Sequence, residues 1–249
     1  MKIVSFNGSP KGESGNTNVM VTAFLEGAKA AGAEVENIFL ANKEINHCKG
    51  CGFCVTSEQR TCIIKDDMAD LISKFVESDI VVLASPLRID NISGMLQVFI
   101  ERCVFCIPDP HFEKDENGET RGGKSKRFKN GIPPKIVVLS NAGYPERSHF
   151  QVVSLLMKRV ARQLHTELVA EIYTSEGGFL TTGVKELEPL ISGYKKLLHK
   201  AGQEIVTNME LSGETQNLLE TIFIPAEIYN QETNKYLDTY RQDHGRNAC

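Results

Sequence analysis

The chain has 249 residues, of which 41% are hydrophobic and 24% are charged, and its net charge at pH 7 is −4. Such values are typical of one large globular domain, or of one domain with appendages. They give no electrostatic case for a nucleic-acid partner, and no apolar stretch is long enough to span a membrane. The seven cysteines, an odd number, and the absence of an export signal predict a cytoplasmic protein without a disulfide framework.

The first predicted element is a buried strand at residues 2–6, followed by a loop at 7–17 that is rich in Gly, Ser and Asn. A helical pattern comes next. Strand, glycine/serine loop and helix together are typical of a phosphate site, because the N–H groups and the dipole at a helix N-terminus favour an anion. The loop has neither a Gly-x-Gly-x-x-Gly nor a Walker A motif, which favours a single phosphate. An ordinary turn with a helix cap explains the loop equally well.

The second predicted strand, at residues 34–40, leads into a loop with four cysteines within fifteen residues. These cysteines are Cys48, Cys51, Cys54 and Cys62. Four thiolates from a short loop containing Gly50 and Gly52 suit an iron–sulfur cluster, and they also suit tetrahedral zinc. Zinc sites usually pair two separated Cys-x-x-Cys motifs, so iron–sulfur is favoured. A third interpretation is a loop with incidental thiols. His47 is either a donor to the cluster or a surface residue.

Three further strands alternate with helices along the rest of the chain. The strands are predicted at residues 79–84, 135–139 and 166–173. Three helices are predicted, with inward-facing apolar residues within 68–75, 92–103 and 153–164, and a last helix is predicted at 186–210. Five strands alternating with five helices predict an α/β fold with a doubly wound parallel sheet. In the flavodoxin-like strand order 2-1-3-4-5, the loops after strands one, three and four meet at the switch point, so we infer this order. The cysteine loop is then expected at the same edge of the sheet.

Two segments fall outside this alternation. Residues 108–131 carry little apolar material and are predicted to form a functional lid or a flexible insertion. The basic run 121–129 either touches a phosphate or forms a solvated hairpin tip, and the tip is favoured. The tail has helical spacing and is expected to pack on this subunit or on a partner. We therefore predict a domain at 1–212, with the cysteine loop at 47–62, and a C-terminal helical extension at 213–249. Cys103 is expected to be buried, whereas Cys106 could be exposed.

Four motifs occur in a specific order. They are Gly8-Ser9-Pro10-x-x-x-Ser14-Gly15-Asn16-Thr17, the four-cysteine loop, Asp66-Asp67-Met68 and Ser85-Pro86. Together, over about residues 1–175, they resemble the iron–sulfur flavoproteins, a branch of the NAD(P)H-dependent FMN reductase family with a flavodoxin-like fold. The resemblance implies FMN, a 4Fe-4S cluster, and a homodimer or homotetramer with both cofactors near subunit interfaces.

The resemblance also assigns residues to these cofactors. The FMN phosphate would be held by Ser9, Lys11, Ser14, Asn16 and Thr17. The isoalloxazine ring would be held by Ser85, Pro86, Leu87, Arg88 and Ile89, and by Asn141, Ala142, Gly143 and Tyr144. The cluster ligands would be Cys48, Cys51, Cys54 and Cys62. The chain departs from the family at residues 87–89, where an aromatic residue is usual. Arg88 would either stabilise an anionic reduced flavin or turn to solvent.

Three functions stay open. The first is an FMN- and 4Fe-4S-containing electron-transfer flavoprotein that takes electrons from a ferredoxin-like donor and reduces a small acceptor, without a protein nucleophile or general base. The second is an NAD(P)H-dependent FMN or quinone reductase whose cysteines are structural or bind zinc. The third is a non-enzymatic redox-sensing module. The sequence has no recognisable nicotinamide site, which favours the first.

Overall fold

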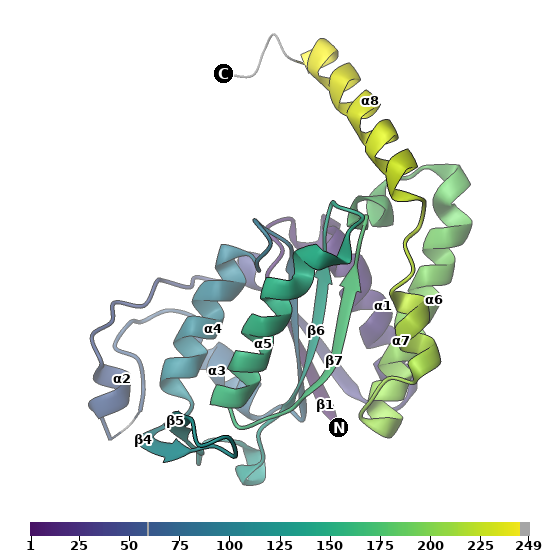
Figure 1. Cartoon of the computed structure of the whole chain (residues 1–249). Coiled ribbons are helices and arrows are strands. Elements are labelled where there is room, and N and C mark those ends of the chain that lie inside the picture. Colours follow the sequence, from purple (N-terminus) through teal and green to yellow (C-terminus); the bar gives the residue numbers. More distant parts are fainter. Residues whose placement is uncertain (59, 245–249) are drawn as a thin grey trace.

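The computed structural model of the protein describes residues 1–58 and 60–244 (Figure 1). Its central sheet has five parallel strands in the order β2-β1-β3-β6-β7. The strands are β1 (Lys2–Asn7), β2 (Glu34–Phe39), β3 (Ile80–Pro86), β6 (Lys135–Asn141) and β7 (Leu168–Thr174). This is the flavodoxin-like order predicted from the sequence, so the predicted doubly wound sheet is confirmed.

Helices cover both faces of the sheet (Figure 1). One layer consists of α1 (Asn16–Ala30) and α6 (Glu188–Asn208). The other consists of α3 (Met68–Val76), α4 (Gly94–Cys106) and α5 (Gln151–Gln163). Because successive strand residues point to opposite faces, β3 contributes Val81 and Leu83 to one core and Val82 and Ala84 to the other. A strand buried on both faces is apolar throughout, which is why it was readable in the sequence.

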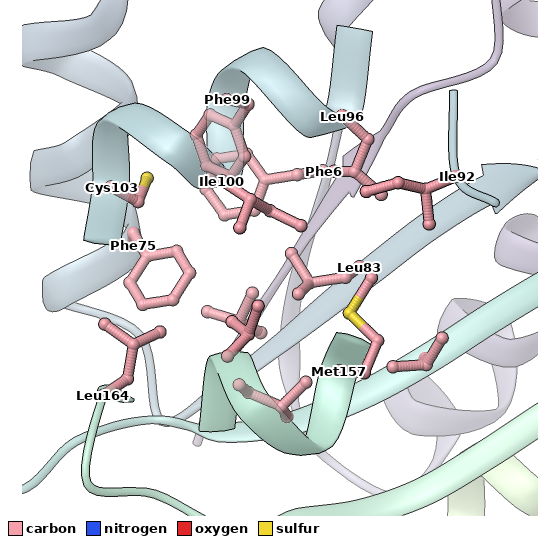
Figure 2. Close-up of a cluster of buried hydrophobic side chains, with 14 of the residues drawn as sticks. Phe6, Phe75, Leu83, Ile92, Leu96, Phe99, Ile100, Cys103, Met157 and Leu164 are labelled. Carbon is pink, nitrogen blue, oxygen red and sulfur yellow. The ribbon is translucent and has the colours of Figure 1, made fainter. Parts of the chain in front are cut away.

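Aromatic rings hold α3 and α4 against β1 (Figure 2). Phe6 stacks on Phe99 with ring centroids 4.4 Å apart, and Phe75 lies 5.9 Å from Phe6. Cys103 belongs to this cluster, as predicted. Cys106 is equally buried, at 2% exposed, so the expectation that it could be exposed is wrong. The reason is that the last turn of α4 is covered by the cysteine loop and by the chain after residue 123.

The insertion forms an antiparallel hairpin of β4 (Asp109–Lys114) and β5 (Thr120–Gly123). The chain reverses at residues 115–119, because Asp115 accepts hydrogen bonds from the backbone N–H groups of Asn117 and Glu119 and so closes the turn. The tip of the hairpin is therefore acidic. The prediction that the basic run forms a solvated hairpin tip is therefore wrong. The run lies on and after β5, and Arg127 Nη1 donates 2.8 Å to the carbonyl of Cys106.

The C-terminal region contains α7 (Gly213–Leu219) and α8 (Ala226–His244). The carboxylate of Glu204 on α6 accepts hydrogen bonds from Ser212 and Thr215, which anchors α7. Tyr229, near the start of α8, is buried, but the rest of α8 extends away from the sheet (Figure 1). The tail is helical and its first part packs on this subunit; the division at 212 stays a prediction. Within the described residues no helix has the length and apolarity needed to cross a membrane.

Candidate cofactor site

The loop between β1 and α1 leaves the first turn of α1 open. Its N-cap is Gly15, no described side chain caps the helix, and the first turn holds no acidic residue. A Cβ on Gly15 would lie 2.6 Å from Ser9 Oγ, so the loop closes tightly here because this residue is glycine. Unpaired N–H groups and the positive end of the helix dipole together favour an anion at this position.

Polar side chains surround that helix end. Ser9 and Thr17 are buried at 3% and 1% exposed, and Ser9 Oγ accepts from Lys11 N over 3.3 Å. Thr17 Oγ1 accepts 2.8 Å from Asn141 Nδ2, so the Thr17 proton is available to a ligand. The buried Asn7 Nδ2, at the end of β1, has no hydrogen-bond partner. Hydroxyl and amide donors of this kind fit a phosphate group.

Hydrogen bonds join the three loops that follow β1, β3 and β6. Ser93, the N-cap of α4, donates 2.6 Å from Oγ to the carbonyl of Gly8 and accepts from the backbone N–H of Leu96. The backbone N–H of Ser93 donates 2.8 Å to Ser85 Oγ. The backbone N–H of Leu87 donates 2.8 Å to the carbonyl of Asn141. The predicted convergence of these loops is thus present in the structure.

The loop after β3 ends in a two-residue turn. Ile89 and Asp90 have positive φ values of 48° and 55°, and Arg88 and Asn91 pair across them. A β-branched residue rarely adopts this conformation, and such strain tends to occur at functional sites. The Ile89 side chain is fully exposed. Arg88 is also exposed, which corresponds to the alternative in which it turns to solvent.

The same turn contacts the loop after β6. Asp90 Oδ1 lies 2.8 Å from His149 Nδ1, and His149 stacks on Tyr144 with ring centroids 4.5 Å apart. The Tyr229 hydroxyl donates 2.5 Å to the carbonyl of Gly143. The C-terminal region therefore supports one of the predicted ring-binding loops, a contact that the sequence analysis did not anticipate.

The cysteine loop is closed at its base by two aspartates. Asp67 Oδ2 accepts from Glu44 N over 2.8 Å, and Asp66 Oδ2 accepts from Asn46 N over 2.9 Å. Asp66 Oδ1 also accepts from the backbone N–H of Met68, the first residue of α3, over 3.2 Å, whereas Asp67 makes no capping side-chain bond to that helix. Its carboxylate instead joins the two ends of the loop.

The four predicted cluster ligands lie along this loop in different environments. Cys54, on the single-turn helix α2 (Phe53–Thr56), and Cys62 are half-buried against the core. Burial and the neighbouring thiols of Cys54 and Cys62 raise the pKa of Cys106 to about 12, which places these three side chains together. Cys48 is half-buried and Cys51 is exposed. Across residues 1–58 and 60–244, no group of three or more His, Cys, Asp or Glu side chains is arranged to hold a metal ion.

A buried arginine lies beneath the loop. Arg102 is 2% exposed, forms an ion pair with Asp66, and donates 3.1 Å from Nη1 to the carbonyl of Asn46. Burial acts to lower the pKa of Arg102, but hydrogen bonds to Asp66 and Cys62 outweigh it and the pKa is raised. Arg102 Nε and Nη2 are buried and lack a partner of good hydrogen-bond geometry. Unsatisfied cationic donors beside Cys62 fit an anionic group such as an iron–sulfur cluster with thiolate ligands.

α4 separates the two groups of residues. Ser93 begins the helix at the phosphate loop, and Arg102 lies nine residues later, on the order of 14 Å along the axis. The cysteine loop starts near the sheet edge, where His47, Gly94 and Met95 line a cavity of about 240 Å³. We expected the cysteine loop at the same edge of the sheet as the loops after β1, β3 and β6. Only the beginning of the cysteine loop lies there, because Cys54 and Cys62 pack near the other end of α4.

Comparison with known proteins identifies relatives of this chain. Residues 1–122 match the family model described as NADPH-dependent FMN reductase. An iron–sulfur flavoprotein of Archaeoglobus fulgidus is 39% identical over 146 residues, 59% of this chain and 58% of that protein. An iron–sulfur flavoprotein of Methanocaldococcus jannaschii is 37% identical over 102 residues, 41% of this chain and 51% of that protein. The matches thus span little more than half the length of these relatives.

Solved structures share the fold. An FMN-dependent NADH-azoreductase from Bacillus anthracis, in complex with FMN, superposes with a TM-score of 0.58 at 17% identity, covering 83% of this chain and 99% of that chain. An NAD(P)H:quinone oxidoreductase from Methanothermobacter marburgensis gives a TM-score of 0.56 at 14% identity, covering 82% and 96%. At such identities the likeness extends to the fold alone.

The five-stranded sheet, with its joined loops at the switch point, is that of a flavodoxin-like protein. Residues 1–122 are similar to the NADPH-dependent FMN reductase family, and the relatives that the chain matches include iron–sulfur flavoproteins.

Proposed function

We propose that this protein is a flavin-dependent oxidoreductase that binds FMN at the three joined loops and a 4Fe-4S cluster in the cysteine loop. It would pass electrons from a ferredoxin-like donor by way of both cofactors to a small acceptor. The observation that carries the proposal is the open N-terminus of α1, enclosed by loops that hydrogen-bond to one another. Assembly as a homodimer or homotetramer and a reducing cytoplasmic location, which suits the free thiols, are part of this proposal.

In the FMN site, each loop has its own task. The first turn of α1 would hold the phosphate, with donors from Ser9, Lys11, Ser14, Asn16 and Thr17. The ring would lie against the loops after β3 and β6, formed by Ser85, Pro86, Leu87, Arg88 and Ile89 and by Asn141, Ala142, Gly143 and Tyr144. The exposed apolar side chain of Ile89 and the stacked Tyr144 ring offer the surfaces that a flat aromatic ligand needs.

In the cluster site, Cys48, Cys51, Cys54 and Cys62 would be the ligands. Positive φ values at Gly50 and Gly52, 62° and 69°, let the loop reverse direction between successive cysteines. Asp66 and Asp67 hold the two ends of the loop together, which would help Cys48 and Cys62 to approach a common ligand. The cysteines would have to converge further than they do in this structure to surround a cluster.

When bound, FMN supplies one- and two-electron redox chemistry and a four-iron cluster supplies one-electron transfer. The residues of this chain bind and orient these groups and set their electrostatic surroundings. The ordered loops around Asn141 and Ser93 would position the ring edge, and the His149–Asp90 pair would hold the loop tips together at one side of it.

A cluster-free NAD(P)H-dependent reductase is the second candidate. Two observations favour it. Among the described residues, no group of three or more His, Cys, Asp or Glu side chains is arranged to hold a metal ion. In addition, most of the length of α4 separates Cys54 and Cys62 from the loops proposed to bind FMN. In that case the cysteine loop is structural, or it binds zinc.

Rapid mixing under anaerobic conditions separates the two candidates. We expect a reduced ferredoxin to bleach the bound flavin quickly and NADPH to do so slowly. The variant Cys54→Ser/Cys62→Ser should keep its flavin but lose the fast reaction with ferredoxin, and Cys103→Ser serves as the control. Fast bleaching by NADPH that is unchanged in the double variant would contradict the electron-transfer function and favour the reductase.

A further inference from the structure

The cysteine loop rests on a buried guanidinium that has more donors than partners. Arg102 projects from α4 and its side chain is 1% exposed, as is unusual for an arginine. Nη1 is satisfied by Asp66 and by the carbonyl of Asn46, whereas Nε and Nη2 are buried without a partner. Buried polar groups in proteins are nearly always hydrogen-bonded, so these two N–H groups require an acceptor.

The acceptor must lie on the cysteine-loop side of the guanidinium. Asp66 already accepts from Asn46 and from the backbone N–H of Met68 as well as from Nη1. Cys62, a residue of the cysteine loop, is a near neighbour of the guanidinium. Cys54 lies on the same side, since both thiols approach Cys106 on the next turn of α4. The free donors are therefore buried beside the cysteine loop, with Cys62 as a near neighbour.

We propose that Arg102 is a positioning residue for the iron–sulfur cluster, and that its Nε and Nη2 groups donate to the sulfur of Cys62. This inference rests on the proposed function. Hydrogen bonds to ligand sulfurs stabilise the more negative, reduced form of a cluster and so raise its reduction potential. Asp66 has the opposite charge effect, and it also keeps the guanidinium directed at the loop.

Arg102 and Asp66 should have effects of opposite sign on the cluster's reduction potential, which allows their roles to be distinguished. Arg102→Gln removes the positive charge and the forked donors; Asp66→Asn removes the negative charge and leaves the guanidinium in place. If the pair only held the loop closed, both variants would lower cluster content alike and neither would shift the potential in a defined direction.

The test is a spectroelectrochemical titration of the anaerobically purified holoprotein, with iron, sulfide and flavin content measured on each sample. We expect Arg102→Gln to lower the cluster's midpoint potential by about 59 mV, a tenfold change in the one-electron equilibrium. Asp66→Asn should shift it upward, while the flavin content of both variants stays as in the wild type. Shifts of the same sign, or no shift in Arg102→Gln, would overturn the proposal.

Arg102→Lys keeps the inference testable if Arg102→Gln cannot be loaded. The lysine retains the positive charge but lacks the planar, forked donors of arginine, so we expect a smaller decrease in the cluster's midpoint potential. An unchanged midpoint potential would overturn the proposal. Equal loss of the cluster from all three variants would also overturn the proposal, because the ion pair would then only hold the cysteine loop closed. Wild-type protein with flavin but no iron would instead refute the proposed cluster itself, so the two failures are distinguishable.

Discussion

Asn141 Nδ2 donates a 2.8 Å hydrogen bond to Thr17 Oγ1, and so joins the loop after β6 to the first turn of α1. The two residues are 124 positions apart in the chain and are both buried. Because Thr17 Oγ1 accepts from this amide, its own proton is directed elsewhere. The contact links the loop proposed for the flavin ring to the turn proposed for the phosphate.

Loss of this contact should weaken FMN binding. Asn141→Ala removes a neutral hydrogen bond worth about 1 kcal/mol, so we expect the dissociation constant of FMN to rise about fivefold. Calorimetric titration of the apoprotein with FMN measures it. Asn217→Ala, at an exposed position on α7, is the control and should bind as the wild type does. The same FMN affinity in both variants would contradict a role of the Asn141–Thr17 hydrogen bond in FMN binding.

The tight closure at Gly15 gives a second prediction. A Cβ there would lie 2.6 Å from Ser9 Oγ and 3.2 Å from Lys11 Cβ, so Gly15→Ala must displace the Ser9 hydroxyl. Overpacking of this kind costs about 1–3 kcal/mol, and we expect FMN affinity to fall about tenfold or more. Gly193→Ala on α6 has no atom within 4 Å of its new Cβ and should leave affinity unchanged. Wild-type FMN affinity in Gly15→Ala would show that the loop does not bind the phosphate.

The buried carboxyl of Glu176 predicts a pH dependence of stability. Burial raises the pKa of Glu176, although the backbone N–H groups of Phe223 and Ile224 act to lower it. The folded state therefore holds its proton to higher pH than the unfolded state does. This group contributes stability that is complete below the ordinary glutamate pKa of about 4.3 and is lost as pH rises through the folded pKa.

Glu176→Gln should flatten that decline. The free energy of unfolding, measured in urea between about pH 4 and pH 8, should fall less steeply with pH in the variant than in the wild type. The exposed Glu186→Gln provides the matched control and should keep the wild-type slope. Identical slopes in Glu176→Gln and the wild type would mean that Glu176 titrates as an ordinary surface carboxyl.

The insertion should stabilise the cysteine loop. Arg127 Nη1 donates 2.8 Å to the carbonyl of Cys106 and 3.3 Å to the carbonyl of Arg60. Arg127→Ala removes both bonds, so we expect trypsin to cut after Arg60 or Lys65 about five times faster, the effect of about 1 kcal/mol on local opening. Lys126→Ala deletes one exposed basic residue next to it and should leave the rate unchanged. Equal cleavage rates in the two variants would contradict this role.

The sheet could be predicted because its signals are local. The run from Ile80 to Ala84 is buried on both faces and is apolar throughout, and the loop residues after three strands are of the kinds that bind anions. Strand order followed from the requirement that those loops meet. The structure confirms the order, joins Thr17 to Asn141 by a hydrogen bond, and links Ser85 through Ser93 to the loop that contains Ser9, although their roles toward FMN stay predictions.

The parts that could not be predicted depend on contacts distant in sequence. Arg102 lies next to Cys103 on α4, and nothing local in the sequence signals its pairing with Asp66, 36 positions earlier. The bond from Tyr229 to Gly143 spans 86 positions. The hairpin tip was misplaced because the charge of the basic run was weighed above the turn residues Asp115 and Gly118, which decide where the chain reverses.

We propose that this chain carries both a flavin and an iron–sulfur cluster. The most direct test is the visible spectrum of protein purified without oxygen, with flavin, iron and labile sulfide assayed on the same sample. We predict about one FMN and about four irons with matching sulfide per chain, since four thiolates hold one cubane. Flavin without iron would contradict the cluster and leave a simple flavin reductase, and protein with neither would contradict the cofactor sites altogether.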